Sequence, residues 1–433
     1  MHEKFNYKSL DEVCARAGAL GAWLPLWDDL SPLQRPLTVA GHVLPNRLAL
    51  QPMEGTDGLD DGAPGPYTLR RYQRFAAGGA SLIWFEAVAT VPEARASAHQ
   101  LWLTPENLDA YRRMTDAIRE TGLRENGFAP LIIMQATHSG RYSKPHGVPE
   151  PLIAYNNPCL EGDTPIDPAR ILDDDALAGY AARFGPAARL AQAAGFDGVD
   201  IKCCHRYLAC ELLSAYERPG RYGGSFENRT RFLREAYQAA RADTSGAFLL
   251  TSRLNIYDGF PYPYGFGMAR EGGLAPDWTE AIALTEMLIA QGAPLLNLTM
   301  GNPYKNPHVN RPYDVGGYVP EEHPLTGLSR MMTGVAAIQH AHPDIPMIGS
   351  AFSYLRGYSA NLAAGMVGEG HAAMAGFGRM AFANPDFPRQ LAGEGAIDSA
   401  RACIACGQCA LLLRAGQPAG CVVRDGGTYR PAQ

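Results

Sequence analysis

The chain has 433 residues, of which 46% are hydrophobic and 19% charged, enough to bury one large core or the cores of two ordinary domains. Its formal net charge of −6, with acidic and basic residues interspersed, argues against a surface for nucleic acid or an anionic membrane. No apolar run approaches the ~18 residues that a membrane-spanning helix needs, and residues 1–14 lack the basic-then-apolar profile of a secretory signal peptide. We therefore expect a cytoplasmic globular protein that contacts neither nucleic acid nor membrane.

Eight apolar segments of strand length recur along the chain and predict strands at 48–53, 81–88, 129–135, 196–202, 247–254, 293–300, 345–352 and 372–379. Helical patterns lie between several of them, most clearly at 175–195, 230–242 and 278–292. This alternation predicts an α/β fold, and eight β/α units fit a (β/α)8 TIM barrel with long loops better than an open sheet. We expect an N-terminal helical extension at 1–35, the barrel at 36–390 and an appended segment at 391–433.

Polar residues follow three of the predicted strands. The third runs into QATHSGRYS (135–143), the fourth into KCCHRYLACELL (202–213), and the fifth ends in SRLN (252–255). Alone, Gln135 could be a turn residue, Arg253 half of an ion pair, and His205 or Tyr207 a packing residue. In a barrel the carboxyl ends of the strands meet on one rim and carry the chemistry. Together these side chains therefore predict an active site.

Four cysteines near the end of the chain form the pattern C-x2-C-x2-C-x11-C: Cys403, Cys406, Cys409 and Cys421. In a reducing compartment such spacing indicates metal or redox chemistry, not disulfides. Three closely spaced thiolates with a distant fourth suit a [4Fe-4S] cluster. Structural zinc usually takes two separated pairs of ligands. The spacing favours the cluster and leaves zinc, or no metal, as alternatives.

These stretches resemble the old yellow enzyme family of FMN-dependent oxidoreductases over residues 36–390. The motifs that carry the resemblance are NRLALQPM (46–53), QATHSGRY (135–142), GFDGVDIKCCHRYL (195–208), RYGGSFENRTRFL (221–233), EGGL (271–274) and FGRMAFANPDFP (377–388). The cysteine segment is similar to that of the iron–sulfur branch, which includes 2,4-dienoyl-CoA reductase and trimethylamine dehydrogenase. The resemblance therefore strengthens the expectation of a [4Fe-4S] centre beside an FMN barrel.

The resemblance implies a set of FMN contacts. Gln135 would hydrogen-bond the flavin pyrimidine edge, and Arg253 would place a positive charge near flavin N1 and O2. Further contacts are implied from Pro52, Met53, Glu54 and Ala87 to the ring, and from Gly349, Ser350, Ala351, Gly378 and Arg379 to the phosphate.

The resemblance also implies catalytic roles. Tyr207 would protonate the α-carbon of an alkene conjugated to a carbonyl, while reduced FMN gives a hydride to the β-carbon. Lys202 and His205 occupy the family's carbonyl-polarising pair, but a lysine there is a departure, and it could instead form an ion pair with a loop carboxylate. Glu54 is a second departure, because a carboxylate near the flavin opposes reduction unless it is protonated or turned away. Cys203 and Cys204 are expected to pack.

We therefore expect an FMN- and [4Fe-4S]-dependent ene-reductase acting on an enoate, enone or enoyl thioester. Loops at 257–273 and 302–318 are expected to cover the pocket and admit a bulky substrate. The alternatives are an amine dehydrogenase like trimethylamine dehydrogenase and a non-catalytic electron-transfer subunit.

The branch members named above continue past the cysteines into a nucleotide-binding region, whereas only VVRDGGTYRPAQ follows Cys421 here. The expectation is therefore a separate electron-donor protein, a flavoprotein subunit or a ferredoxin, docking near 400–425. Direct reduction by NADH or NADPH is the alternative, and a homo-oligomer stays open.

Overall fold

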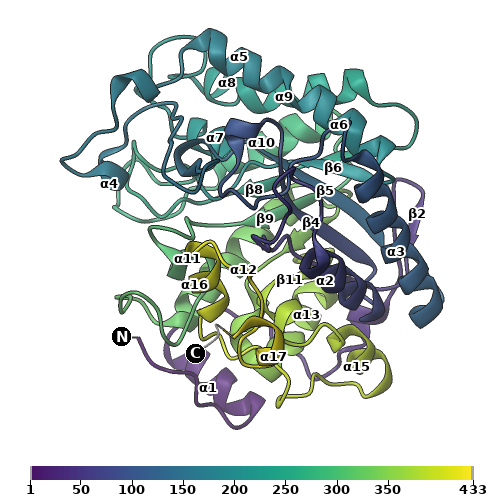
Figure 1. Cartoon of the computed structure of the whole chain (residues 1–433). Coiled ribbons are helices and arrows are strands. Elements are labelled where there is room, and N and C mark those ends of the chain that lie inside the picture. The colour runs from purple at the N-terminus through teal and green to yellow at the C-terminus, as the bar shows by residue number, and fades with distance from the viewer. Residues whose placement is uncertain (1, 431–433) are drawn as a thin grey trace.

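A computed structural model describes residues 2–430, and its centre is a barrel of parallel strands (Figure 1). Nine strands of this part of the chain form one sheet in the order β7-β6-β5-β4-β3-β11-β10-β9-β8. The two ends of that order, β7 (Leu249–Thr251) and β8 (Arg253–Asn255), are halves of one barrel strand interrupted at Ser252. β7 pairs with β6 and β8 with β9, so the sheet closes on itself. The predicted (β/α)8 TIM barrel is confirmed.

Each of the eight predicted strand segments contains a strand. The other barrel strands are β3 (Leu48–Leu50), β4 (Leu82–Ala89), β5 (Leu131–Thr137), β6 (Gly198–Ile201), β9 (Leu296–Thr299), β10 (Met347–Gly349) and β11 (Met374–Phe377). Most are shorter than predicted, because the last apolar residues of several segments belong to the loops that leave the barrel.

Helices surround the barrel. They are α2 (Pro66–Ala77), α3 (Leu108–Asn126), α4 (Pro158–Glu161), α5 (Asp174–Ala182), α6 (Phe184–Ala193), α7 (Leu208–Leu212), α8 (Phe226–Arg229), α9 (Arg231–Asp243), α10 (Thr279–Ala290), α11 (Pro307–Asn310), α12 (Pro324–Ala341), α13 (Ser359–Gly368), α14 (Arg379–Ala383) and α15 (Phe387–Gly393). The helix predicted at 175–195 is two helices, α5 and α6. Pro186 explains the break, because it has no N–H to donate to the preceding turn.

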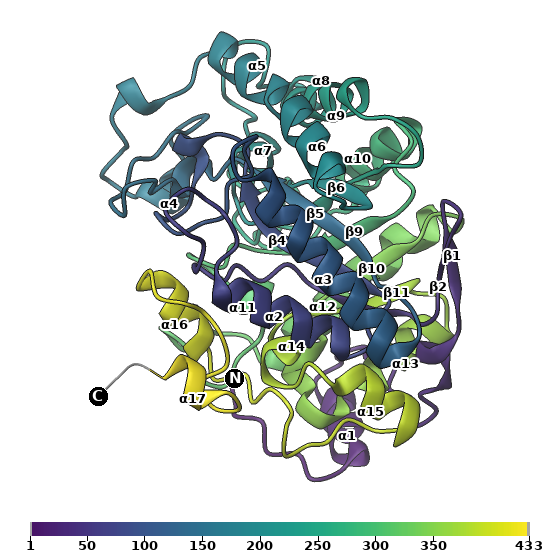
Figure 2. The same cartoon turned by 45° about the vertical axis from the view of Figure 1, so that its right-hand side comes forward.

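The amino end of the barrel is closed by a hairpin. Strands β1 (Leu37–Val39) and β2 (His42–Leu44) pair antiparallel. Val39 and Leu44 pack against the apolar side chains inside the barrel, among them Trp84 and Ile133. Figure 2 shows this hairpin on the opposite side of the molecule from α16 (Gln408–Arg414) and α17 (Gly426–Tyr429). The carboxyl end of the barrel is therefore the end that faces the cysteine segment.

Both terminal segments are attached to the barrel. The N-terminal segment holds one helix, α1 (Leu10–Ala19), and the backbone N–H of Trp27 donates to the Asn361 carbonyl at 3.1 Å. In the C-terminal segment, the Ala419 N–H donates to the Gly55 carbonyl at 2.7 Å, and Asp425 pairs with Arg70 at 2.7 Å. The predicted division into three parts stays a prediction. No helix within residues 2–430 has the length and apolar character needed to span a membrane.

The contact between α13 and the N-terminal segment generates a stability prediction. A Cβ on Gly365 would lie 1.8 Å from the Pro25 carbonyl oxygen, whereas a Cβ on Gly179, also in a helix, meets no atom within 4 Å. Gly365→Ala should destabilise the fold by about 1–3 kcal/mol, the usual scale of overpacking. Gly179→Ala should leave stability unchanged or slightly raised. Thermal unfolding followed by circular dichroism measures both, and equal melting temperatures would contradict the close contact.

Candidate active site

The carboxyl ends of the barrel strands open into one cleft with an empty volume, its mouth included, of about 1080 Å³. Most of the predicted site residues line it: Pro52, Met53, Glu54, Gln135, Lys202, His205, Tyr207, Arg253, Ser350, Ala351, Gly378 and Arg379. Ala87 and Gly349 are buried in their strands and are not among the lining residues. The Ala87 carbonyl accepts instead from Gln100 Nε2 at 3.2 Å.

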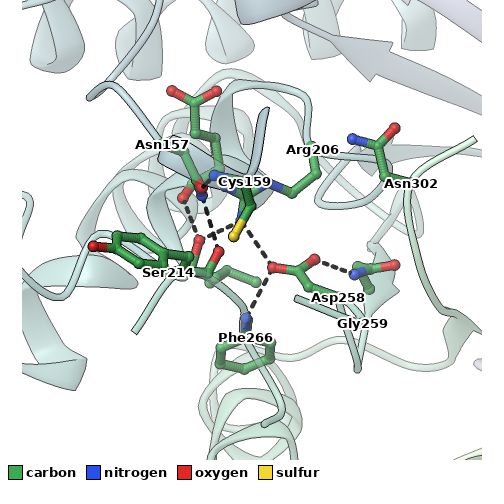
Figure 3. A network of polar contacts seen from close by, with 12 residues as sticks. Asn157, Cys159, Arg206, Ser214, Asp258, Gly259, Phe266 and Asn302 are labelled. Atoms are coloured by element: carbon green, nitrogen blue, oxygen red, sulfur yellow. Dashed lines mark hydrogen bonds and ion pairs between the residues drawn. The ribbon is translucent and has the colours of Figure 1, made fainter. Parts of the chain in front are cut away.

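The segment after β6 carries the three predicted catalytic side chains on a strained backbone. His205 and Arg206 have φ values of +63° and +62°, a left-handed conformation that residues with a Cβ rarely adopt. The Arg206 side chain is buried, and its Nη1 lies 2.8 Å from Asp258 Oδ2 and also contacts Ser214 Oγ (Figure 3). This buried ion pair stabilises the turn that brings Lys202 and Tyr207 to the cleft.

The same hydrogen-bond network fixes the position of loop 257–273, one of the two loops expected to cover the pocket. Asp258 accepts from the Phe266 N–H at 2.8 Å (Figure 3), and its carbonyl accepts from Asn306 Nδ2 at 2.8 Å. No residue of loop 257–273 lines the cleft. The expectation is therefore wrong for this loop, because Asp258 binds it to Arg206 beside the cleft. Loop 302–318 does contribute, through Pro303, Tyr304, Asn310 and Arg311.

The two residues that depart from the family pattern contact each other. Lys202 Nζ lies 3.2 Å from Glu54 Oε1, and the side chains are 2% and 16% exposed. This is the ion pair with a loop carboxylate that the sequence left open for Lys202. Because opposite charges in contact largely cancel at a distance, the pair adds little net charge to the cleft.

Tyr207 and His205 are both held neutral. Burial, followed by the nearby Glu54 carboxylate and Tyr304, raises the pKa of Tyr207 well above its usual value. The Tyr207 hydroxyl donates to Glu54 Oε1 at 3.2 Å and lies 3.0 Å from the Tyr304 hydroxyl. Burial, together with Arg253 and Lys202, lowers the pKa of His205 well below its usual value. The cleft therefore holds a protonated phenol beside an uncharged imidazole at neutral pH.

Gln135 and Arg253 share a buried partner that the sequence analysis did not single out. Asp200 Oδ2 accepts from Gln135 Nε2 at 2.6 Å and from Trp84 Nε1 at 2.7 Å. Its Oδ1 accepts from the Arg253 backbone N–H at 2.7 Å. An aspartate inside an otherwise apolar strand, GVDI (198–201), was the signal that could have identified it. Asp200 thus fixes the side chain of one predicted flavin contact and the backbone of the other.

The four cysteines of the C-terminal segment line one smaller cavity with an empty volume of about 360 Å³. Within residues 2–430, no three His, Cys, Asp or Glu side chains are grouped to hold a metal ion. Burial raises the pKa of Cys403 and Cys409, while Arg379 acts on both thiols in the opposite direction. Arg379, Phe382 and Cys409 line both cavities, so the two are adjacent. The [4Fe-4S] cluster stays a prediction.

Comparison with known proteins gives the family. Residues 32–265 match the NADH:flavin oxidoreductase / NADH oxidase family. The chain belongs to this family. A curated relative from Leishmania infantum, named "Probable flavin mononucleotide-dependent alkene reductase", is 30% identical over 222 residues, 47% of this chain and 58% of that protein. The chain thus matches less than two thirds of the length of that relative.

Two solved structures show the same fold. A 2-naphthoyl-CoA reductase in complex with 2-naphthoyl-CoA superposes with a TM-score of 0.74 at 20% identity, over 93% of this chain and 58% of that one. A histamine dehydrogenase from Rhizobium sp. 4-9 gives 0.69 at 21% identity, over 91% and 52%. At 20% and 21% identity, the two structures show only that the fold is shared. The reaction has to be inferred from the residues of the site.

The cleft fits the flavin that the family binds. Arg253 Nε and Arg379 Nη1 are buried and have no hydrogen-bond partner within residues 2–430. A Cβ on Gly376 would lie 2.8 Å from the Gly349 carbonyl oxygen, so the wall of the cleft requires glycine there. Unpaired guanidinium donors suit the phosphate and carbonyl oxygens of FMN. FMN and nicotinamide use are confirmed for the family, and the individual contacts stay predictions.

The contact between Lys202 and Glu54 generates a testable coupling. Removing either charge leaves the other nearly buried without its partner, whereas removing both does not. Glu54→Gln and Lys202→Met should therefore be non-additive, with a coupling free energy of about 1–3 kcal/mol. Urea unfolding of the wild type, the two single variants and the double variant measures it. Additive losses would contradict the ion pair.

Proposed function

We propose that this protein is an FMN-dependent ene-reductase that reduces an alkene conjugated to a carbonyl, with Tyr207 as the proton donor. The observation that carries the proposal is that the Tyr207 phenol lines the cleft at the carboxyl ends of the barrel strands together with His205 and Lys202. Arg253, Arg379 and Gln135 would hold the cofactor. Bound FMN supplies a hydride to the β-carbon. Tyr207 then gives its proton to the α-carbon, and its O–H bond breaks as the C–H bond forms.

The substrate carbonyl would be polarised from the same side of the cleft. His205 Nε2 lies 3.3 Å from Asn310 Nδ2, which can only donate a hydrogen bond to it. In a neutral ring that accepts through Nε2, the proton is on Nδ1, so Nδ1 is the nitrogen that can donate to a substrate carbonyl. Lys202 can turn an N–H toward the same oxygen, since an ammonium has three donors. An enoate, an enone and an enoyl thioester all offer such a carbonyl.

The charge of the cleft favours an anionic substrate among these. Arg311 lines the cleft and forms no ion pair within residues 2–430, and burial with the nearby Arg379 lowers its pKa to about 10. Glu54 is the only carboxylate among the lining residues of this part of the chain, and Lys202 already pairs with it. An enoate carboxylate, or the phosphates of an acyl carrier, would offset this excess of positive charge.

The same charge argues against the amine dehydrogenase alternative. An amine substrate enters as a cation, and Arg253, Arg311 and Arg379 would repel it. A non-catalytic electron-transfer subunit needs neither Tyr207 nor a carbonyl-binding pair, so both features favour an enzyme.

We also propose that the cysteine segment, residues 391–433, holds a [4Fe-4S] cluster. The four cysteines share one cavity, and a cluster of four irons holds its thiolates farther apart than a single ion does. Arg379, Phe382 and Cys409 lie between this cavity and the cleft, which supports electron transfer from the cluster to the flavin. The separate electron-donor protein, docking near 400–425, stays a prediction, with NADH or NADPH as the alternative donor.

Tyr207→Phe tests the reaction. Photoreduced protein mixed anaerobically with an enoate, its methyl ester and an enoyl thioester should be reoxidised, and Tyr207→Phe should slow that step about 10²-fold, the scale of losing a general acid. Reduction of the flavin should hardly change. Stopped-flow absorbance of the flavin measures both steps.

Tyr354→Phe is the matched control, because Tyr354 is also a buried tyrosine and its hydroxyl has no hydrogen-bond partner within residues 2–430. It should behave like the wild type. Reoxidation of Tyr207→Phe at the wild-type rate would mean that another group donates the proton.

The cluster has its own test. Protein purified without oxygen should contain about four iron and four sulfide per chain. Cys406→Ser should lose the broad visible absorbance of the cluster while FMN stays bound. Cys204→Ser, at a buried cysteine outside the segment, should keep both. One zinc per chain without acid-labile sulfide would contradict the proposal.

A further inference from the structure

The Tyr207 hydroxyl has a second partner, Tyr304, which the sequence analysis did not single out. Lys202 Nζ and the Tyr207 hydroxyl both donate to Glu54 Oε1, each at 3.2 Å. An ionised carboxylate only accepts hydrogen bonds, and a hydroxyl has one proton to give. Since Tyr207 gives that proton to Glu54, the 3.0 Å contact with Tyr304 requires Tyr304 to donate to the Tyr207 oxygen.

Tyr304 is fixed in place although it lies in a loop. Its ring stacks on Tyr142 with centroids 4.0 Å apart. Asn302 connects the two, because its Nδ2 donates to the Tyr142 hydroxyl at 2.6 Å and its Oδ1 accepts from the Tyr304 N–H at 2.8 Å. Tyr304 lines the cleft and is half-buried, whereas Tyr207 is buried. The contact therefore connects the buried Tyr207 phenol to a half-buried tyrosine that lines the cleft.

The surroundings of Tyr207 make such a donor useful. When Tyr207 loses its proton, its oxygen becomes an anion beside the Glu54 carboxylate, and like charges in contact are unfavourable. Lys202 Nζ lies 3.7 Å from the centre of the Tyr207 ring and partly offsets this. A hydroxyl that already points at the oxygen stabilises the charge where it develops and needs no reorganisation.

We propose that Tyr304 is a positioning residue for proton transfer: it donates a hydrogen bond to the Tyr207 oxygen during catalysis and then returns a proton to it. The Tyr207 O–H bond breaks as the proton passes to the substrate. The Tyr304 proton then moves to the Tyr207 oxygen, and a proton from the solvent, passed on by water at the mouth of the cleft, restores the Tyr304 hydroxyl. This inference rests on the proposed role of Tyr207.

The test is a double-variant cycle on the reoxidation of photoreduced protein by the most reactive alkene of the panel. Tyr304→Phe keeps the stacked ring and removes only the hydroxyl, and it should slow reoxidation about 10-fold, the scale of one hydrogen bond to a developing charge. Its solvent deuterium isotope effect should rise, because proton transfer becomes more rate-limiting. In a Tyr207→Phe background the same change should have no further effect.

Tyr313→Phe is the control from the same loop, since the Tyr313 hydroxyl donates to the Tyr318 carbonyl and does not contact Tyr207. It should match the wild type. Flavin absorbance verifies that each variant retains FMN. Tyr304→His restores a ring N–H donor and should recover part of the rate that Tyr304→Phe loses.

Two results would overturn the proposal: an unchanged rate in Tyr304→Phe, or an equal loss in the wild-type and Tyr207→Phe backgrounds. A wild-type rate in Tyr207→Phe itself would instead reject the proposed proton donor, so the two failures are distinguishable.

Discussion

The buried ion pair between Arg206 and Asp258 is the interaction on which the site geometry depends. Two consecutive residues, His205 and Arg206, adopt left-handed backbone conformations, each of which costs about 1–3 kcal/mol for a residue with a Cβ. Such a turn is stable only where other contacts offset this cost. Here the buried Arg206 side chain makes these contacts, with Asp258 and Ser214. Three predicted catalytic side chains within six residues can then face one cleft.

This arrangement makes the loops and the catalytic segment one unit. Asp258 binds Arg206 and also the backbone of Phe266, while Asn306 binds the Asp258 carbonyl. Loop 302–318 is thereby attached to the same network that orients Tyr207, and it returns to the site through Tyr304 and Arg311. A change in this loop would alter both the surroundings of Tyr207 and the charge at the mouth of the cleft.

The sequence predicted the fold well because barrel strands are buried on both faces and appear as apolar runs of strand length. All eight segments contain strands, and most of the residues that the family motifs identified line the cleft. The particular partners of these side chains were not predictable. An ion pair of Lys202 with a loop carboxylate was left open, but Lys202 and Glu54 are 148 positions apart, and Tyr207 and Tyr304 are 97 apart, so nothing local identifies either partner. The resemblance assigned Ala87 to the flavin ring and Gly349 to the phosphate, but both residues are buried in their strands and do not line the cleft.

The two cavities share part of their lining. Arg379, Phe382 and Cys409 line both the cleft and the cysteine cavity, and Tyr207, Glu54 and Tyr304 line the cleft or contact one another in it. The Ala419–Gly55 hydrogen bond then has a functional consequence. It attaches the cysteine segment to the loop that carries Glu54, so the cysteine cavity and the carboxylate partner of Tyr207 are held in one fixed arrangement.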